Sequence, residues 1–209
     1  MLSLLIFWNT KLTSQIYSED FESYNQGDQT GTGSPPVWTS TAPGSLGGFF
    51  EVRDNTNKEF GTNDSNDPGI WESKFVDISS SSSVFISVDI REEGPMDAVQ
   101  DSILLFYKIN NGSEVLWHMA SGEFGSTYKT VLTSNLSGDS IQIIIRVRNG
   151  AVDEFHYFDN IIIDTQDTLF SVTSGNWNDG NTWHTSRTGG PCSCMPASSD
   201  IVAIQNGHT

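Results

Sequence analysis

Short apolar runs and alternating apolar and polar positions recur along this chain, and turn-forming residues separate them. No window of helical length shows an apolar period near 3.6 residues between capping signals, so the pattern favours strands. Short strands separated in this way are typical of an antiparallel β-sandwich. We predict strands at residues 16–21, 48–52, 70–75, 83–90, 102–109, 114–119, 128–132, 140–147 and 155–163.

One pair of these strands has the form of a hairpin. The segment "DSILLFYKINNGSEVLWHMA" carries Asn111-Gly112 between two apolar runs. This dipeptide readily takes the positive φ angles of a tight hairpin turn. In "SIQIIIRVRNG", by contrast, one face is apolar and the other is mixed, which predicts a sheet with one side open to solvent.

The character of the chain changes after Asp164, where a new periodicity begins and both cysteines, Cys192 and Cys194, appear. We therefore predict a β-sandwich over residues 16–165 and the start of a second β-rich module over residues 166–209. Residues 1–15 resemble the end of a secretory signal segment without its basic part, although a first strand is the alternative. The apolar run at residues 2–8 is far shorter than the ~20 residues that span a bilayer.

Charge narrows the possible partners. The 209 residues contain 26 acids and 10 Lys and Arg, and the net charge is -16. Because phosphate binding needs a basic surface, we expect no nucleic-acid partner. The abundant acids favour solubility, and some of them could also hold divalent cations. Few lysines among many Gly, Ser, Thr and Asn residues fit an exported protein, secreted or at the cell surface.

The segment "DEFHYFDNIIID", residues 153–164, combines acids with an apolar strand. It could be a catalytic acid/base cluster, a cation site that closes a sandwich, or a solvated strand edge. First and last strands of a sandwich commonly lie side by side, which would bring Asp20 and Glu22 towards Asp159. Clustered carboxylate oxygens suit Ca²⁺, so we predict a structural calcium at these three residues, with His156 and Tyr157 at the strand edge.

Two further groups of residues are candidates for function. A flat ring at a strand edge or in a loop can stack on a sugar, which makes Trp38, Trp117 and Tyr128 candidate ligand-binding residues, although core positions are the alternative for the tryptophans. A hydrolytic reading would place paired acids among Glu92, Glu93, Asp97 and Asp101. The chain has no metal-spaced histidine motif, GxSxG elbow or phosphate-binding glycine loop, so we assign no catalytic residue.

The order of "SEDFES", "FFEVRD", "GIWESKFVDISSSSSVFISVDIREEG", "DSILLFYKINNGSEVLW" and "DEFHYFDNIIID" resembles that of jelly-roll modules in large exported bacterial proteins. Over about residues 16–164 the chain is similar to laminin-G/MAM-type and carbohydrate-binding-module sandwiches. This resemblance implies an antiparallel jelly-roll β-sandwich. It also implies that a structural calcium joins Glu22 to Asp159, whereas it transfers no sugar-binding residue.

The tail, "SGNWNDGNTWHTSRTGGPCSCMPASSDIVAIQNGHT", is similar to the first turn of strand-rich repeats that open β-helical segments. We expect the whole protein to be longer, with this chain a monomeric module of it that is secreted or at the cell surface and does not span the membrane. The expected function is a non-catalytic recognition or adhesion module that binds glycans. A structural spacer and a polysaccharide-degrading enzyme are the alternatives.

Overall fold

A computed structural model describes residues 15–165, 168–184, 191, 193–196 and 200–209. Residues Gln15–Asp164 form one compact unit, and the described residues from Thr165 onward belong to a second. The expected signal segment falls almost wholly on residues 1–14, outside the described residues. The described part of the chain contains no helix that could cross a membrane.

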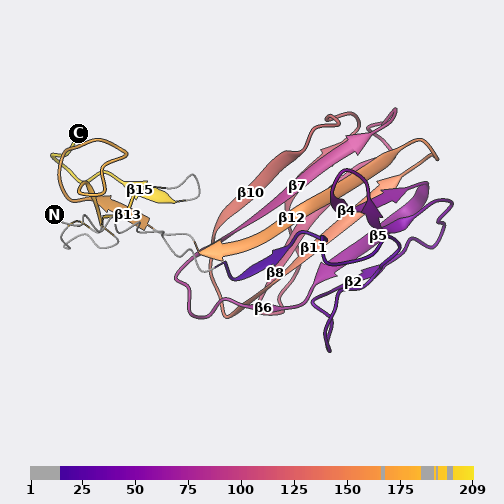
Figure 1. Cartoon of the computed structure of the whole chain (residues 1–209), viewed down its shortest axis with the longest axis horizontal. Coiled ribbons are helices and arrows are strands. Elements are labelled where there is room, and N and C mark those ends of the chain that lie inside the picture. The colour runs from indigo at the N-terminus through magenta and orange to yellow at the C-terminus, as the bar shows by residue number, and fades with distance from the viewer. Residues whose placement is uncertain (1–14, 166–167, 185–190, 192, 197–199) are drawn as a thin grey trace, which may run out of the picture. The chain divides into compact units, whose positions relative to one another are not determined.

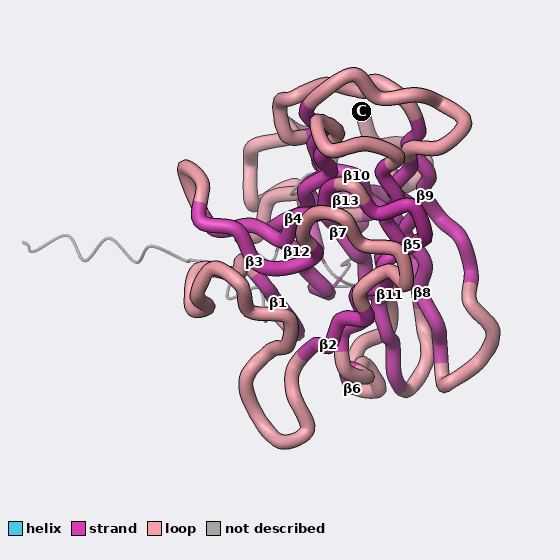
Figure 2. Tube along the Cα trace, turned by 90° about the vertical axis from the view of Figure 1, so that its right-hand side faces the viewer, coloured by secondary structure: helices cyan, strands magenta, loops and turns pink. Residues whose placement is uncertain are grey.

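The unit Gln15–Asp164 is an antiparallel β-sandwich, as predicted, and its two sheets are seen as separate layers in Figures 1 and 2. Sheet A has the strand order β10-β7-β12-β4-β3, with β1 paired to β12. Its strands are β1 (Tyr17–Glu19), β3 (Phe50–Asp54), β4 (Lys58–Asn63), β7 (Val84–Glu93), β10 (Lys129–Leu136) and β12 (Phe155–Thr165). The prediction that the first and closing strands lie side by side is confirmed, because Tyr17 pairs with Ile163 and Glu19 with Ile161.

Sheet B has the strand order β2-β5-β11-β8-β9, with β6 paired to β11. Its strands are β2 (Trp38–Thr41), β5 (Ser65–Ser73), β6 (Val76–Asp77), β8 (Ser102–Ile109), β9 (Val115–Ser121) and β11 (Ser140–Asn149). The predicted hairpin is present as the antiparallel pair β8 and β9. Its turn takes positive φ at Asn110 and Asn111, at 50° and 58°, one position earlier than expected from Asn111-Gly112.

The sequence pattern missed three strands of the sandwich: β2, β4 and the two-residue β6. The sequence of β4, "KEFGTN", has one large apolar residue, Phe60, between a glutamate and a glycine, so it lacks a period-2 signal. In β2 the pattern "WTST" places Trp38 inward and polar residues outward. Pairing with neighbouring strands defines both β4, which pairs with β12 and β3, and β2, which pairs with β5.

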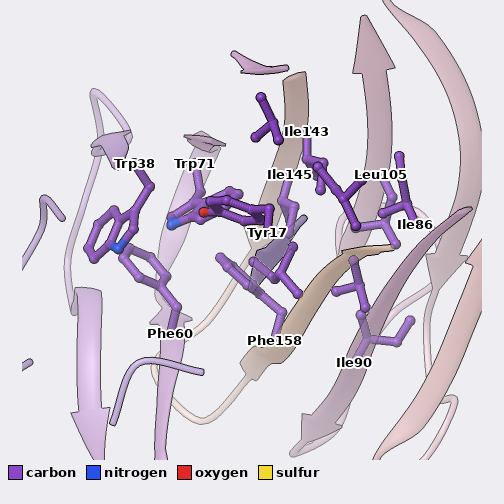
Figure 3. Close-up of a cluster of buried hydrophobic side chains, with 14 of the residues drawn as sticks. Tyr17, Trp38, Phe60, Trp71, Ile86, Ile90, Leu105, Ile143, Ile145 and Phe158 are labelled. Carbon is purple, nitrogen blue, oxygen red and sulfur yellow. The ribbon is translucent and has the colours of Figure 1, made fainter. Parts of the chain in front are cut away.

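Aromatic rings fill one part of the space between the sheets, and aliphatic side chains fill the rest (Figure 3). Trp38 and Trp71 have no exposed surface, and their rings stack with centroids 6.0 Å apart. Phe60 lies against Trp38 and stacks on Phe158 at 5.1 Å. Such aromatic pairs contribute more than their buried area alone, so this cluster holds the two sheets together.

The closing strand β12 does not keep one alternation along its length. Phe158 and Ile161 are both fully buried in the core although they are three residues apart. Asn160 lies between them with φ 47°, a left-handed conformation that Asn adopts more easily than most residues. This extra residue shifts the alternation, so Phe158, Ile161 and Ile163 all face the core.

The strand-edge assignment of His156 and Tyr157 was wrong. His156 has no exposed surface and Tyr157 is 5% exposed. Both are covered because β12 is an inner strand of sheet A, with β7 on one side and β4 and β1 on the other. Ile144, expected on a mixed open face of its strand, is also fully buried.

A small three-stranded sheet lies in the second unit, with the order β14-β13-β15. Its strands are β13 (Thr168–Ser171), β14 (Trp183–His184) and β15 (Ile201–Ala203). Strand β13 pairs antiparallel with β14 and parallel with β15. The start of a β-helical repeat stays a prediction.

The positive φ of Asn160 leads to a test of the alternation shift in β12. Asn160→Val should lower the free energy of unfolding by about 1–3 kcal/mol, because a β-branched residue is strained at this backbone conformation. Asn160→Gly, the matched control, should cost less since glycine accepts the same φ. Urea unfolding followed by tryptophan fluorescence would measure both, and equal losses would contradict the proposed role of the conformation.

Candidate ligand-binding groove and acidic residues

A groove of about 530 Å³ opens on the outer face of sheet A, the face opposite the core. Arg91, Glu59 and Tyr157 reach this face because each is next to a core residue on its strand, and neighbouring side chains of a strand point to opposite faces. Exposed residues of two loops complete the rim. The lining residues are Asn55, Thr56, Asn57, Glu59, Arg91, Glu93, Ser126, Thr127, Tyr128 and Tyr157.

Arg91 and Glu59 form the centre of the groove. The Arg91 Nε donates to Glu59 Oε2 at 2.9 Å, a second guanidinium nitrogen bonds Glu59 Oε1, and the third bonds Glu93. Burial lowers the pKa of Arg91, but the bonds to Glu59 and Glu93 outweigh this and raise it above its usual value. The guanidinium is therefore a permanent cation with two carboxylate partners.

Two more side chains complete the hydrogen bonding of Glu59. The Tyr128 hydroxyl donates to its Oε2, and Asn55 Nδ2 donates to its Oε1 at 2.5 Å. Burial and then the bond to Glu59 raise the pKa of Tyr128, so its hydroxyl stays protonated. Glu59 is only 1% exposed, and its contacts provide the hydrogen bonds that a buried carboxylate needs.

The Tyr157 ring forms the floor beneath Arg91, whose guanidinium carbon lies 3.9 Å from the ring centroid. Tyr157 pairs with Gly61 across β12 and β4. A Cβ on Gly61 would come within 2.8 Å of the Tyr157 ring, so glycine at this position lets the ring lie flat on the sheet. Phe155 lies parallel to Tyr157 with centroids 6.2 Å apart, which extends the row of flat groups along β12.

The structure brings one of the three predicted ligand-binding rings, Tyr128, into the groove. Trp38 lies in the core without exposed surface, so the expectation that its ring meets a ligand is corrected: sheet packing covers it completely. Trp117 is half-buried on β9 of the other sheet and packs against the core. The sequence missed Arg91, Glu59 and Tyr157 as groove residues, because only strand pairing places them together.

The residues of the predicted calcium site lie near the junction of β1 and β12 but differ in burial. Asp159 is 2% exposed, whereas Asp20 and Glu22 are exposed just beyond the end of β1. Asp159 accepts hydrogen bonds from Asn57 Nδ2 at 2.9 Å and from the Asn160 backbone N–H at 2.7 Å. Glu22 Oε1 accepts the Lys58 backbone N–H at 3.0 Å.

Lys58 places its ammonium group beside the same turn. Its Nζ donates to the backbone carbonyl oxygens of Tyr24 at 2.6 Å and Glu22 at 3.1 Å. A cationic side chain therefore already contacts oxygens near the predicted ion. Among the described residues, the group of three acids with converging carboxylate oxygens is a different one, Asp97, Asp101 and Glu154. The calcium site at Asp20, Glu22 and Asp159 stays a prediction.

The four acids considered for hydrolysis do not face one another across one cleft. Glu92 is buried, and its Oε1 accepts the Gly125 backbone N–H at 2.6 Å. Glu93 lines the groove and binds Arg91. Asp97 and Asp101 lie in the loop between β7 and β8, where the Asp97 backbone N–H donates to Asp101 Oδ2 at 2.6 Å. Different parts of the sandwich therefore hold these carboxylates.

Comparisons with known proteins found similar solved structures but no family. No family model matches the chain, and no curated protein matches it. TmCBM61, solved in complex with β-1,4-galactotriose, has TM-score 0.47 and 12% identity, covering 60% of this chain and 86% of that one. The K3 cleaved adhesin domain of Lys-gingipain from Porphyromonas gingivalis w83 has TM-score 0.49 and 9% identity, covering 73% and 99%.

A third similar structure is the CBM22-1 xylan-binding domain of Paenibacillus barcinonensis Xyn10C. It has TM-score 0.40 and 12% identity, and the match covers 73% of this chain and 94% of that one. The chain is thus similar to β-sandwiches of carbohydrate-binding modules and of an adhesin domain. At these identities the likeness concerns the fold alone.

The environment of Asp159 predicts how stability depends on pH in the absence of metal. Burial raises the pKa of Asp159 to about 7; the Asn160 backbone N–H opposes this, and the charges of Glu59, Asp89 and Asp20 add to it. An unfolded aspartate has a pKa of about 3.9. The folded protein thus holds a proton that the unfolded chain releases, and stability falls as pH rises from about 4 to about 7.

Asp159→Asn should remove this loss, because the amide keeps the size of the side chain without the charge. At pH 8 in EDTA we expect the variant to unfold about 2–4 °C above the wild type, and at pH 4 the two should be similar. Thermal unfolding across this pH range is the measurement. Asp153→Asn, at an exposed acid in the turn before β12, serves as control. An Asp159→Asn protein with the wild-type pH profile would contradict the assignment to Asp159.

Proposed function

We propose that this chain is a non-catalytic recognition module that binds a neutral glycan in the groove on the outer face of sheet A. The observation that carries the proposal is the Arg91–Glu59–Tyr128 network, which holds polar groups rigidly in an open groove. Prepositioned planar polar groups lose little freedom on binding, which favours recognition of a ligand with many hydroxyls.

Charge balance favours a neutral ligand over an anionic one. Arg91 is the cation at the centre of the groove, and both Glu59 and Glu93 pair with it. The two carboxylates outnumber the guanidinium, and the whole chain is strongly acidic, with net charge -16. An anionic ligand would be repelled, whereas sugar hydroxyls can donate to the carboxylates and accept from the guanidinium and amides.

The same geometry favours binding over hydrolysis. Paired catalytic carboxyl groups face each other across the scissile bond, one as acid and one as base or nucleophile. In this groove both carboxylates are oriented by one guanidinium. We therefore propose a secreted or cell-surface module that acts by adhesion or by targeting a longer chain. A spacer role remains the second candidate, since it needs no ligand.

Blocking the groove tests the glycan proposal. Thr127 is exposed on the rim, so Thr127→Trp should leave the fold intact and weaken glycan binding by about tenfold or more, equivalent to about 1.4 kcal/mol. A glycan array would identify the ligand class, and calorimetry would then compare dissociation constants. Ser113→Trp, in the exposed hairpin turn of sheet B, is the matched control.

The outcomes separate the two candidate functions. Binding that Ser113→Trp retains and Thr127→Trp loses would support the groove as the site. A wild-type protein that binds no glycan would favour the spacer. Binding that Thr127→Trp leaves unchanged would assign the ligand to another surface.

We propose in addition that Asp159 contributes to a structural calcium site with Asp20 and Glu22. The support is the burial of the Asp159 carboxylate together with the acids around it, which raise its pKa and make it costly to ionise without a cation. Equilibrium dialysis should show that Asp159→Asn binds one Ca²⁺ fewer than the wild type. Equal stoichiometry of the two proteins would remove Asp159 from the set of ligands.

A further inference from the structure

Two loops meet at one end of the sandwich, residues 94–101 between β7 and β8 and residues 150–154 between β11 and β12. The Gly150 backbone N–H donates to Asp101 Oδ1 at 2.7 Å. A Cβ on Gly94 would lie 1.9 Å from the Asp153 carbonyl oxygen, so the backbones approach each other closely. These contacts fix the distance between acidic side chains of the two loops.

Three carboxyl groups converge at this junction. Asp97, Asp101 and Glu154 each offer one oxygen, and these oxygens lie within 4.8 Å of one another. Asp101 has no exposed surface, Glu154 is 6% exposed, and Asp97 is exposed. Among the ion pairs of the described residues, none joins a Lys, Arg or His to any of the three. Their negative charge therefore lacks a cationic partner in the described protein.

An independent observation at Glu154 points to a ligand at this junction. Its Oε2 atom is buried and has no hydrogen-bond partner. Asp101, by contrast, accepts one backbone N–H on each oxygen. Leaving a buried carboxylate oxygen unpaired is costly, since it has lost its water without gaining a partner.

The unpartnered oxygen of Glu154 lies among other oxygens. The position that a Cβ of Gly150 would occupy is 3.5 Å from Glu154 Oε2, 3.6 Å from Asp101 Oδ1 and 3.4 Å from Gln100 Oε1. Apart from Gly150 and its chain neighbours, the three heavy atoms nearest to this point are thus carboxylate and amide oxygens. Hard cations prefer such a set, and Ca²⁺ accepts the irregular geometry that loops supply.

We propose that Asp97, Asp101 and Glu154 form a Ca²⁺ site that links the loop before β8 to the turn before β12. Glu154 Oε2 and the two aspartates supply carboxylate oxygens, and Gln100 Oε1 lies close enough to join them. The exposed side of Asp97 leaves access for the ion and for water ligands. The site is separate from Asp159 and from the groove, because none of its residues lines that groove.

Glu154→Gln tests the proposal, because its effect on stability should be opposite in EDTA and in Ca²⁺. Without cation, burial and the charge of Asp101 raise the pKa of Glu154, so the neutral amide should be at least as stable as the wild type in EDTA. In millimolar Ca²⁺ the wild type should gain several degrees in unfolding temperature, and the variant should gain less. The variant should therefore unfold at the same or a higher temperature than the wild type in EDTA, and at a lower temperature in Ca²⁺.

Calcium calorimetry on the full chain, in both the wild type and the Asp159→Asn protein, isolates this site from any ion at Asp159. In both backgrounds, Glu154→Gln should lower the affinity for one Ca²⁺ by about tenfold or more. Loss of a direct ligand should cost at least as much as loss of a residue that only hydrogen-bonds to a ligand. Glu123→Gln, at an exposed acid of a nearby loop, should leave affinity unchanged. Absence of Ca²⁺ binding in the Asp159→Asn protein, or an affinity that Glu154→Gln does not alter, would overturn the proposal.

Discussion

The structure depends on the two-sided burial of strand β12. Its inward residues, Phe158, Ile161 and Ile163, complete the core between the sheets, and its outward residues Tyr157 and Asp159 are also almost fully covered. A strand of this kind needs partners on both edges, and β7 lies on one side with β4 and β1 on the other. Asn160 lies between the part of β12 that pairs with β4 and the part that pairs with β1. Its left-handed conformation shifts the inward–outward alternation of side chains there, so that core residues face inward in both parts.

The outer groove follows from the same strand. Tyr157 can lie flat only because its cross-strand neighbour is Gly61, and its ring then supports Arg91 from β7. Arg91 in turn orders Glu59 from β4, which also receives the Tyr128 hydroxyl from beside β10. Residues of β4, β7 and β12 and the loop residue Tyr128 are therefore joined by hydrogen bonds and a ring contact into one network. The proposed recognition in this groove depends on the rigidity of the network more than on any single side chain.

Acidic residues have different physical roles in different parts of the sandwich. Glu59 is stabilised by Arg91, and Glu19 by the Phe21 backbone N–H and the Tyr24 hydroxyl. Asp159 and Glu154 are instead buried beside other carboxylates, which disfavours their ionised forms. The net charge of -16 therefore does not describe one acidic surface. It includes Glu59, which is buried and paired with a guanidinium, and Asp159 and Glu154, whose ionised forms burial disfavours.

The sequence alone determined the all-β class and most strands, because period-2 patterning and turn residues act locally. The pairing of the first and closing strands was expected only from what is common in sandwiches. The sequence also predicted Tyr128 as a ligand-binding residue, and the structure places this ring in the outer groove. Only the tertiary structure decided that Trp38 belongs to the core and that Arg91, Glu59 and Tyr157 meet in a groove. Residues from separate strands come together through sheet order and register, and a local pattern in the chain carries neither. The same reason explains why Glu154, far along the chain from Asp97 and Asp101, could not be linked to them before the loops were seen to meet.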